Sequence, residues 1–313
     1  MREESLFFDS RDGVSKVYAR KWLPDEGAPI AILQITHGMA EHIERYKEFA
    51  NYLTDRGIAV VGDDHLGHGK TAAKNGLKGY FCKNDPATVV VRDEHRLKKT
   101  IQQEYPGVPY FIMGHSMGSF IVRNYLCEYG SGVNGAIVMG TGMQPKALLY
   151  VSKFMAAING LFKGERSVAM FINGVAFGAY NKNIPDQKTS FDWLSRNEEN
   201  VSRYMEDPDC GFVFTVNGFK TLFELIMRLH DKSRVAKIPQ ELPILVTSGE
   251  ADPVGEYGKA VKTVFSEYET LGIKDVTLKL YPEDRHEILN EVDRQQVFSD
   301  IFEWINARIK KEN

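Results

Sequence analysis

The first 140 residues repeat a pattern in which short apolar runs are separated by longer amphipathic segments. The short runs have the length and composition of buried strands. They are 15–22, 31–36, 58–61, 110–113 and 135–140, with 6–8 as a hairpin partner of the first. The longer segments, 46–56 and 88–105, place apolar side chains along one helix face. Strands joined by helices predict a mostly parallel central sheet with helices on both faces, an α/β fold.

This pattern stops between residues 143 and 238. Helical patterns replace it at 147–162, 190–204 and 212–229. The stretch is too long for an ordinary connection. We therefore predict a core formed by residues 1–142 and 239–313, interrupted by a helical cap at 143–238.

The strand and helix pattern resumes after the cap. We expect strands at 243–247 and 276–281 and helices at 255–271 and 293–309. Lys310 and Lys311 follow the last helix. Their positive charges would stabilise the helix by interacting with the negative end of its dipole.

Composition narrows the classes of protein that fit. The chain has 313 residues, 43% of them hydrophobic and 26% charged, as in an ordinary globular protein. A net charge of -3 and the lack of a basic block give no indication of nucleic-acid binding. The charged start of the sequence lacks the apolar core of a signal peptide, and no run is long enough to span a bilayer. We expect a cytoplasmic location.

The segment Gly114-His115-Ser116-Met117-Gly118 carries the clearest chemical signal. It follows a predicted strand and precedes a helical pattern, so Ser116 lies at a sharp strand-to-helix turn. The G-x-S-x-G spacing exposes a nucleophilic hydroxyl there, while small neighbours let strand and helix approach closely. A glycine-rich turn with a buried serine would have the same spacing. Ser116 is the candidate nucleophile.

A serine nucleophile requires a base and a carboxylate that orients it. Asp252 follows the strand at 243–247, and His286 follows the strand at 276–281. The carboxyl ends of parallel strands meet at one edge of a sheet, so we expect both beside Ser116. Glu250 and Asp284 are rival carboxylates. We prefer Asp252 because the proline after it fixes the turn, and we interpret Glu287 as a helix-start residue.

The developing oxyanion requires two backbone N–H donors. Met117 follows the nucleophile directly, and Met39 follows Gly38 in the loop after the strand at 31–36. We expect these two residues to form the oxyanion hole.

Other polar residues receive structural interpretations. His65 and His68 lack further metal-ligand partners in the sequence and are surrounded by glycines, so we interpret them as a turn and expect no metal or cofactor. Cys82, Cys127 and Cys210 form no disulfide or zinc pattern. Cys210 either approaches the pocket beneath the cap or is a small buried side chain.

The cap is rich in apolar residues. Between 148 and 162 they follow helical spacing, and a second apolar run begins at Val168. These side chains either pack onto the core, line an acyl tunnel, or contact lipid membranes or micelles transiently.

These segments together resemble one family. Residues 37–42 with Arg45 and Tyr46, the turn at 64–71, the Ser116 segment and residues 285–291 resemble monoacylglycerol lipases and bacterial lysophospholipase-like, serine aminopeptidase-like hydrolases. Thr71 replaces the serine of the D-x-x-G-x-G-x-S turn, and in the cap only 207–212 matches clearly. The resemblance implies an α/β-hydrolase fold, hydrolysis of small-molecule carboxylic esters without a cofactor, and a triad of Ser116, Asp252 and His286.

Three functions remain open. The first is a lipase-type esterase that cleaves monoacylglycerols or lysophospholipids through an acyl-enzyme on Ser116. The second is a carboxylesterase or a peptidase of small substrates, for which Glu198, Glu199 and Glu206 are candidate ammonium ligands, although we favour a solvated helix face as their role. The third is a non-catalytic ligand-binding protein.

Overall fold

Among residues 1–309, a single sheet of eight strands organises the core. The structure is a computed structural model that describes residues 1–309. Its strands are β1 (Arg2–Asp9), β2 (Lys16–Leu23), β3 (Ala31–Thr36), β4 (Ile58–Asp63), β5 (Tyr110–His115), β6 (Gly135–Met139), β7 (Ile244–Gly249) and β8 (Val276–Tyr281). Their order across the sheet is β1-β2-β4-β3-β5-β6-β7-β8.

The sheet is parallel from β4 to β8, and β2 runs antiparallel to both of its neighbours. Every residue of β3, β4, β5, β6 and β7 is buried, as expected for strands covered on both faces. This burial explains why the sequence shows continuous apolar runs there. The edge strand β1 is mostly exposed.

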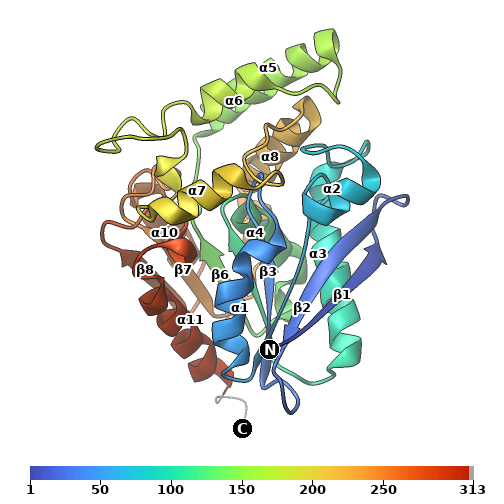
Figure 1. Ribbon diagram of the computed structural model, residues 1–313, viewed down its shortest axis with the longest axis vertical. Helices are drawn as coiled ribbons and strands as arrows, with labels where there is room; N and C mark the ends of the chain where they lie inside the picture. The colour runs from blue at the N-terminus through green and yellow to red at the C-terminus, as the bar shows by residue number, and fades with distance from the viewer. Residues whose placement is uncertain (310–313) are drawn as a thin grey trace.

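Helices cover both faces of the sheet (Figure 1). Apolar residues of α1 (Lys47–Thr54) and α11 (Arg294–Ile309) pack in one core cluster. Those of α3 (Pro86–Glu104), α4 (Met117–Tyr129) and α10 (Lys259–Thr270) pack in another. The predicted α/β architecture is confirmed.

A helical insertion lies between β6 and β7. Its helices are α5 (Lys146–Lys163), α6 (Met170–Phe177), α7 (Glu198–Glu206), α8 (Val216–Arg228) and α9 (Lys232–Val235). In Figure 1, α5 and α6 lie at the end of the molecule farthest from the C-terminal end of α11, with α7 and α8 between them and the sheet. The predicted cap limits, 143 and 238, fall in the connections that flank these helices.

Several expected helix limits are wrong. The helix expected at 212–229 begins at Val216, because the Thr215 side chain caps it by accepting a bond from the Gly218 N–H. The helix expected at 255–271 begins at Lys259, since Glu256, Tyr257 and Gly258 all have positive φ. The expected 190–204 helix is a short 3-10 turn followed by α7.

Three helices, α2 (Gly69–Asn75), α6 and α9, were not expected, and the stretch that forms α6 was predicted only as an apolar run. The helix α2 begins within a glycine-rich turn, so its first residues show no helical spacing of apolar side chains. Lys310 and Lys311 lie outside the described residues. Among residues 1–309, no helix combines the length and apolar character needed to cross a bilayer.

The close approach of α4 to the sheet yields a stability prediction. A Cβ on Gly118 would lie 1.9 Å from the Thr36 carbonyl oxygen, whereas one on Gly174 in α6 would have nothing within 4 Å. We expect Gly118→Ala to lower the free energy of unfolding by about 3 kcal/mol, because a backbone oxygen cannot give way. Gly174→Ala should leave stability unchanged or raise it by up to about 1 kcal/mol, through helix propensity. Denaturant unfolding of both variants checks this, and equal losses would contradict it.

Candidate active site

Ser116 occupies a strained turn between β5 and α4. Its φ of 54° and ψ of -120° lie outside the regions that side chains favour. Two glycines make the turn feasible: a Cβ on Gly114 would lie 2.2 Å from the Gly118 carbonyl oxygen. The partly exposed Ser116 lies at the N-terminus of α4, where the helix dipole favours negative charge.

Asp252 and His286 lie in the loops that follow β7 and β8. The Asp252 carboxylate lies 2.9 Å from Nδ1 of His286 and also accepts bonds from the Ser248 hydroxyl and the Val254 N–H. Burial alone would raise the pKa of Asp252, but the charge and hydrogen bond of His286 outweigh it and the pKa lies below its usual value. The carboxylate is therefore held in the form that orients an imidazole.

The second ring nitrogen of His286 is available. Within residues 1–309, Nε2 has no hydrogen-bond partner. His286 and Ser116 line the same cavity, while Asp252 is fully buried behind them. The rival carboxylates have other surroundings, since Asp284 pairs with Arg196 and Glu250 is exposed.

The two residues expected to form the oxyanion hole both lie close to Ser116. Met117 is the first residue of α4, so its N–H has no acceptor within the helix. Met39 belongs to the loop after β3, and a Cβ on the preceding Gly38 would lie 3.2 Å from Cβ of Ser116. Met39 and Met117 both line the cavity.

The cavity has a volume of about 470 Å³ and lies between the sheet edge and the insertion. Most of its walls are apolar or aromatic, contributed by α4, by α6 to α8 with the segments between them, and by the loop after β7. These wall residues are Phe120, Phe177, Tyr180, Phe191, Trp193, Leu194, Tyr204, Phe212, Val213, Leu222, Ile226 and Val254. The site therefore joins a polar reactive end to an apolar chamber.

A buried ion network that the sequence did not indicate surrounds the site. The Arg45 guanidinium donates to Glu41 at 2.7 Å, to both oxygens of Glu287 at 2.6 and 2.7 Å, and to Asn200 of α7 at 3.2 Å. Glu41 also accepts the Gly38 N–H at 2.6 Å. The network therefore connects the oxyanion loop, the His286 loop and the cap. Glu287 does precede a short 3-10 turn, as expected, but ion pairing is its main role.

Opposite charges control ionisation in this network. Burial alone would raise the pKa of Glu41, but a hydrogen bond from His115 and the Arg45 charge hold it well below its usual value. Burial opposes ionisation of Glu287 as well, and Arg45 outweighs it.

His65 and His68 form a buried turn behind the oxyanion loop. The His65 N–H donates to Nε2 of His37 at 3.1 Å, and the rings of His37 and His65 stack. His65 also has two carboxylate neighbours: Nδ1 lies 3.4 Å from Asp63 and 3.3 Å from Glu94. Glu94 comes from α3, which is why the sequence gave no indication of it. Burial raises its pKa well above the usual value.

Cys210 does not line the cavity. It is buried against Leu194 and Tyr204, and this burial raises the pKa of its thiol. Of the two interpretations, the small buried side chain fits the structure.

The outer surface of the cap is apolar. Only Leu149 and Ala156 of α5 are fully buried, while Leu161 and Phe162 are 84% and 86% exposed. Simple packing of this helix face onto the core is therefore wrong. A groove of about 280 Å³ lies on this surface, lined by Phe154, Met155, Ile158, Asn159, Phe162, Lys163 and Phe171.

Comparison with known families gives a match over most of the chain. The sequence profile of the family described as "Serine aminopeptidase, S33" matches residues 27–293. The monoglyceride lipase of Rattus norvegicus is 28% identical over 297 residues, which cover 94% of this chain and 88% of that protein.

Two solved structures resemble the whole molecule. A thermostable carboxyl esterase from Bacillus coagulans, in complex with glycerol, has a TM-score of 0.89 and 34% identity, covering 99% of each chain. A structure described as a lipase in an open form also has a TM-score of 0.89, with 27% identity, covering 98% of this chain and 99% of that one. The similarity therefore includes the inserted helices.

The Arg45 network yields a second prediction. We expect Arg45→Met to lower the free energy of unfolding by about 3–5 kcal/mol, because it leaves two buried carboxylates without their cation. Arg203→Met is the matched control: Arg203 lies 3.9 Å from Glu199 with both side chains mostly exposed, so its loss should change stability little. Chemical denaturation measures both, and a tolerated Arg45→Met would show that the network contributes little.

Proposed function

The chain belongs to the family described as Serine aminopeptidase, S33, as a serine hydrolase of the monoacylglycerol lipase and esterase type, and we propose that it cleaves esters with long acyl chains. The resemblance noted in the sequence is thereby confirmed, and with it the α/β-hydrolase fold. The proposed substrates are monoacylglycerols or lysophospholipids. The observation that carries the proposal is the apolar chamber of about 470 Å³ that opens onto Ser116 and His286.

The proposed reaction proceeds in two halves. Oγ of Ser116 attacks the ester carbonyl carbon while Nε2 of His286 takes the hydroxyl proton. The oxyanion of the tetrahedral intermediate accepts hydrogen bonds from the backbone N–H groups of Met39 and Met117. Collapse breaks the bond to the alcohol, which leaves with the proton from His286, and an acyl-enzyme remains. Water activated by His286 then attacks the acyl-enzyme, which releases the fatty acid and restores Ser116.

Asp252 supports this cycle through its bond to Nδ1. Its lowered pKa keeps it ionised, so it stabilises the imidazolium each time His286 holds the extra proton. No step in this cycle requires a metal or an organic cofactor.

The acidic residues of the cavity favour an ester over a peptide substrate. An aminopeptidase needs a free carboxylate to bind the substrate ammonium. The acidic side chains among the described lining residues are Glu41 and Glu287, and both pair with Arg45. Glu198, Glu199 and Glu206 are exposed on α7 and do not line the cavity.

The outer cap surface supports a lipid-like substrate. Many apolar side chains of α5 and α6 are exposed, and these two helices lie at the end of the molecule away from the sheet (Figure 1). A patch of this kind marks a protein or membrane contact, and a single-chain lipid substrate is presented in micelles or bilayers. We propose that this surface makes transient contact with such aggregates.

The first test is covalent labelling. A fluorophosphonate should mark Ser116 in the wild-type protein, because attack on phosphorus requires the same nucleophile, base and oxyanion donors as attack on an ester. Ser116→Ala should be unlabelled and inactive but fold normally. Mass spectrometry of the labelled peptide identifies the site. A correctly folded wild-type protein that takes no label would favour the non-catalytic alternative.

The second test concerns acyl length. We expect kcat/KM for monomeric p-nitrophenyl esters to rise from acetyl to medium chains by up to about fourfold for each methylene that becomes buried. Ile226→Trp, which fills the chamber wall, should remove the rise for longer chains. Phe162→Ser, on the outer surface, should keep it. A preference of the wild-type enzyme for acetate would contradict the long-chain assignment.

A further inference from the structure

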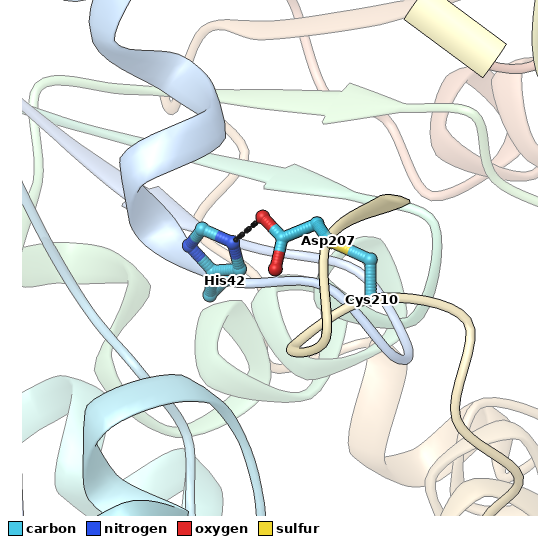
Figure 2. Close-up of side chains that lie close together, drawn as sticks. All are labelled: His42, Asp207 and Cys210. Atoms are coloured by element: carbon cyan, nitrogen blue, oxygen red, sulfur yellow. Dashed lines mark hydrogen bonds and ion pairs between the residues drawn. The ribbon is translucent and has the colours of Figure 1, made fainter. Parts of the chain in front are cut away.

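A second cluster of reactive side chains lies at the junction of cap and core. His42 follows the oxyanion loop and precedes the 3-10 turn Ile43–Tyr46, while Asp207 and Cys210 lie in the loop after α7. Figure 2 shows the His42 imidazole facing the Asp207 carboxylate, with Cys210 beside Asp207. None of the three lines the cavity.

The donor atoms of the three residues converge. Nε2 of His42 lies 2.9 Å from Oδ2 of Asp207, and one donor atom of each residue, including Sγ of Cys210, lies within 4.8 Å of the others. Cys210 forms no disulfide. Imidazole, thiolate and carboxylate are the ligands that zinc prefers, at about 2.0–2.3 Å. Small side-chain movements would bring all three atoms around one ion.

We propose that His42, Asp207 and Cys210 bind one borderline-soft divalent cation, of which Zn²⁺ is the type, across the junction between cap and oxyanion loop. Three protein ligands leave a fourth position for water, because His42 and Asp207 remain partly exposed.

The backbone holds these ligands in place before any ion binds. The Asp209 N–H donates to Oδ1 of Asp207 at 2.8 Å, which leaves Oδ2 for the ion. The Cys210 N–H donates to the Asp207 carbonyl at 3.0 Å, which keeps both ligands on one turn. The Gly211 N–H and the Tyr204 hydroxyl both donate to the Ala40 carbonyl at 3.0 Å. Bonds that fix ligand orientation commonly strengthen a metal site.

Neighbouring cations do not oppose an ion here, because each already has a carboxylate partner. Arg45 pairs with Glu41 and Glu287, and Lys78 pairs with Asp209 at 2.8 Å. Asp207 and a Cys210 thiolate would therefore bring net negative charge to the ion.

Such an ion would link the cap to the oxyanion loop, because its ligands come from both. Residues 211–213 follow Cys210 directly and line the cavity, while Met39 and Ala40 line it from the other side of the junction. Binding should therefore restrain the wall of the chamber relative to Ser116. A change in turnover on binding rests on the proposed function, but the binding itself does not.

The test uses Co²⁺ as a spectroscopic probe for the full-length protein after treatment with a chelator. Wild-type protein should bind one equivalent and show thiolate-to-cobalt charge-transfer absorption. Cys210→Ser should lose that absorption. His42→Ala and Asp207→Asn should weaken Co²⁺ binding at least about tenfold, the lower end of the loss seen when even an outer-shell partner is removed. Cys82→Ser and Cys127→Ser remove the other two cysteines and should keep the signal.

Thermal unfolding of the wild-type protein tests metal binding without any substitution. Zn²⁺ should raise the Tm of the wild-type protein by a few degrees, since the ion binds only the folded site. No charge-transfer absorption in the wild-type protein, or the same absorption in folded Cys210→Ser, would overturn the proposal. Labelling of Ser116 by a fluorophosphonate in metal-free protein reports separately on the proposed function.

Discussion

The buried ion pairs of Arg45 determine how the separate parts of this molecule meet. One guanidinium contacts Glu41 of the oxyanion loop, Glu287 beside His286, and Asn200 of the cap. Removing these charges from water is costly, and the cost is recovered only when all partners are in place. The ion pairs therefore stabilise the one arrangement in which the oxyanion loop, the His286 loop and the cap all contact Arg45. Glu41 extends this constraint to the backbone, because it accepts the N–H of Gly38 directly before Met39.

Much of the site could be predicted because parallel strands impose it. Loops that follow neighbouring strands share one edge of a sheet, so Ser116, Asp252 and His286 could be expected together from their positions after β5, β7 and β8. The Arg45 network could not, because Glu287 and Asn200 lie 242 and 155 residues from Arg45 in the sequence. Two helix starts, that of α8 in the cap and that of α10 in the core, were missed for a local reason: the Thr215 cap and the positive φ of Tyr257 are features that hydrophobic patterns do not record.

The cap presents apolar surface in two directions. Its inner residues, such as Phe177 and Ile226, line the chamber above Ser116, while Phe162 and Leu161 face outward. An apolar helix pattern has the same spacing whether it faces a core, a cavity or a lipid surface. The sequence could therefore establish the helix but not what its apolar face contacts.

The positive φ of Ser116 has a consequence for how this protein tolerates change. Such a conformation costs on the order of 1–3 kcal/mol, a sizeable share of the roughly 5–15 kcal/mol that separates folded from unfolded states in a typical domain. The packing of β5 and α4 must offset that cost, so less of their packing energy contributes to the net free energy of unfolding. The reactive turn therefore narrows the mutational tolerance of residues that never contact a substrate. A destabilising core substitution that a protein with an unstrained turn would tolerate therefore brings this chain closer to the stability at which it unfolds.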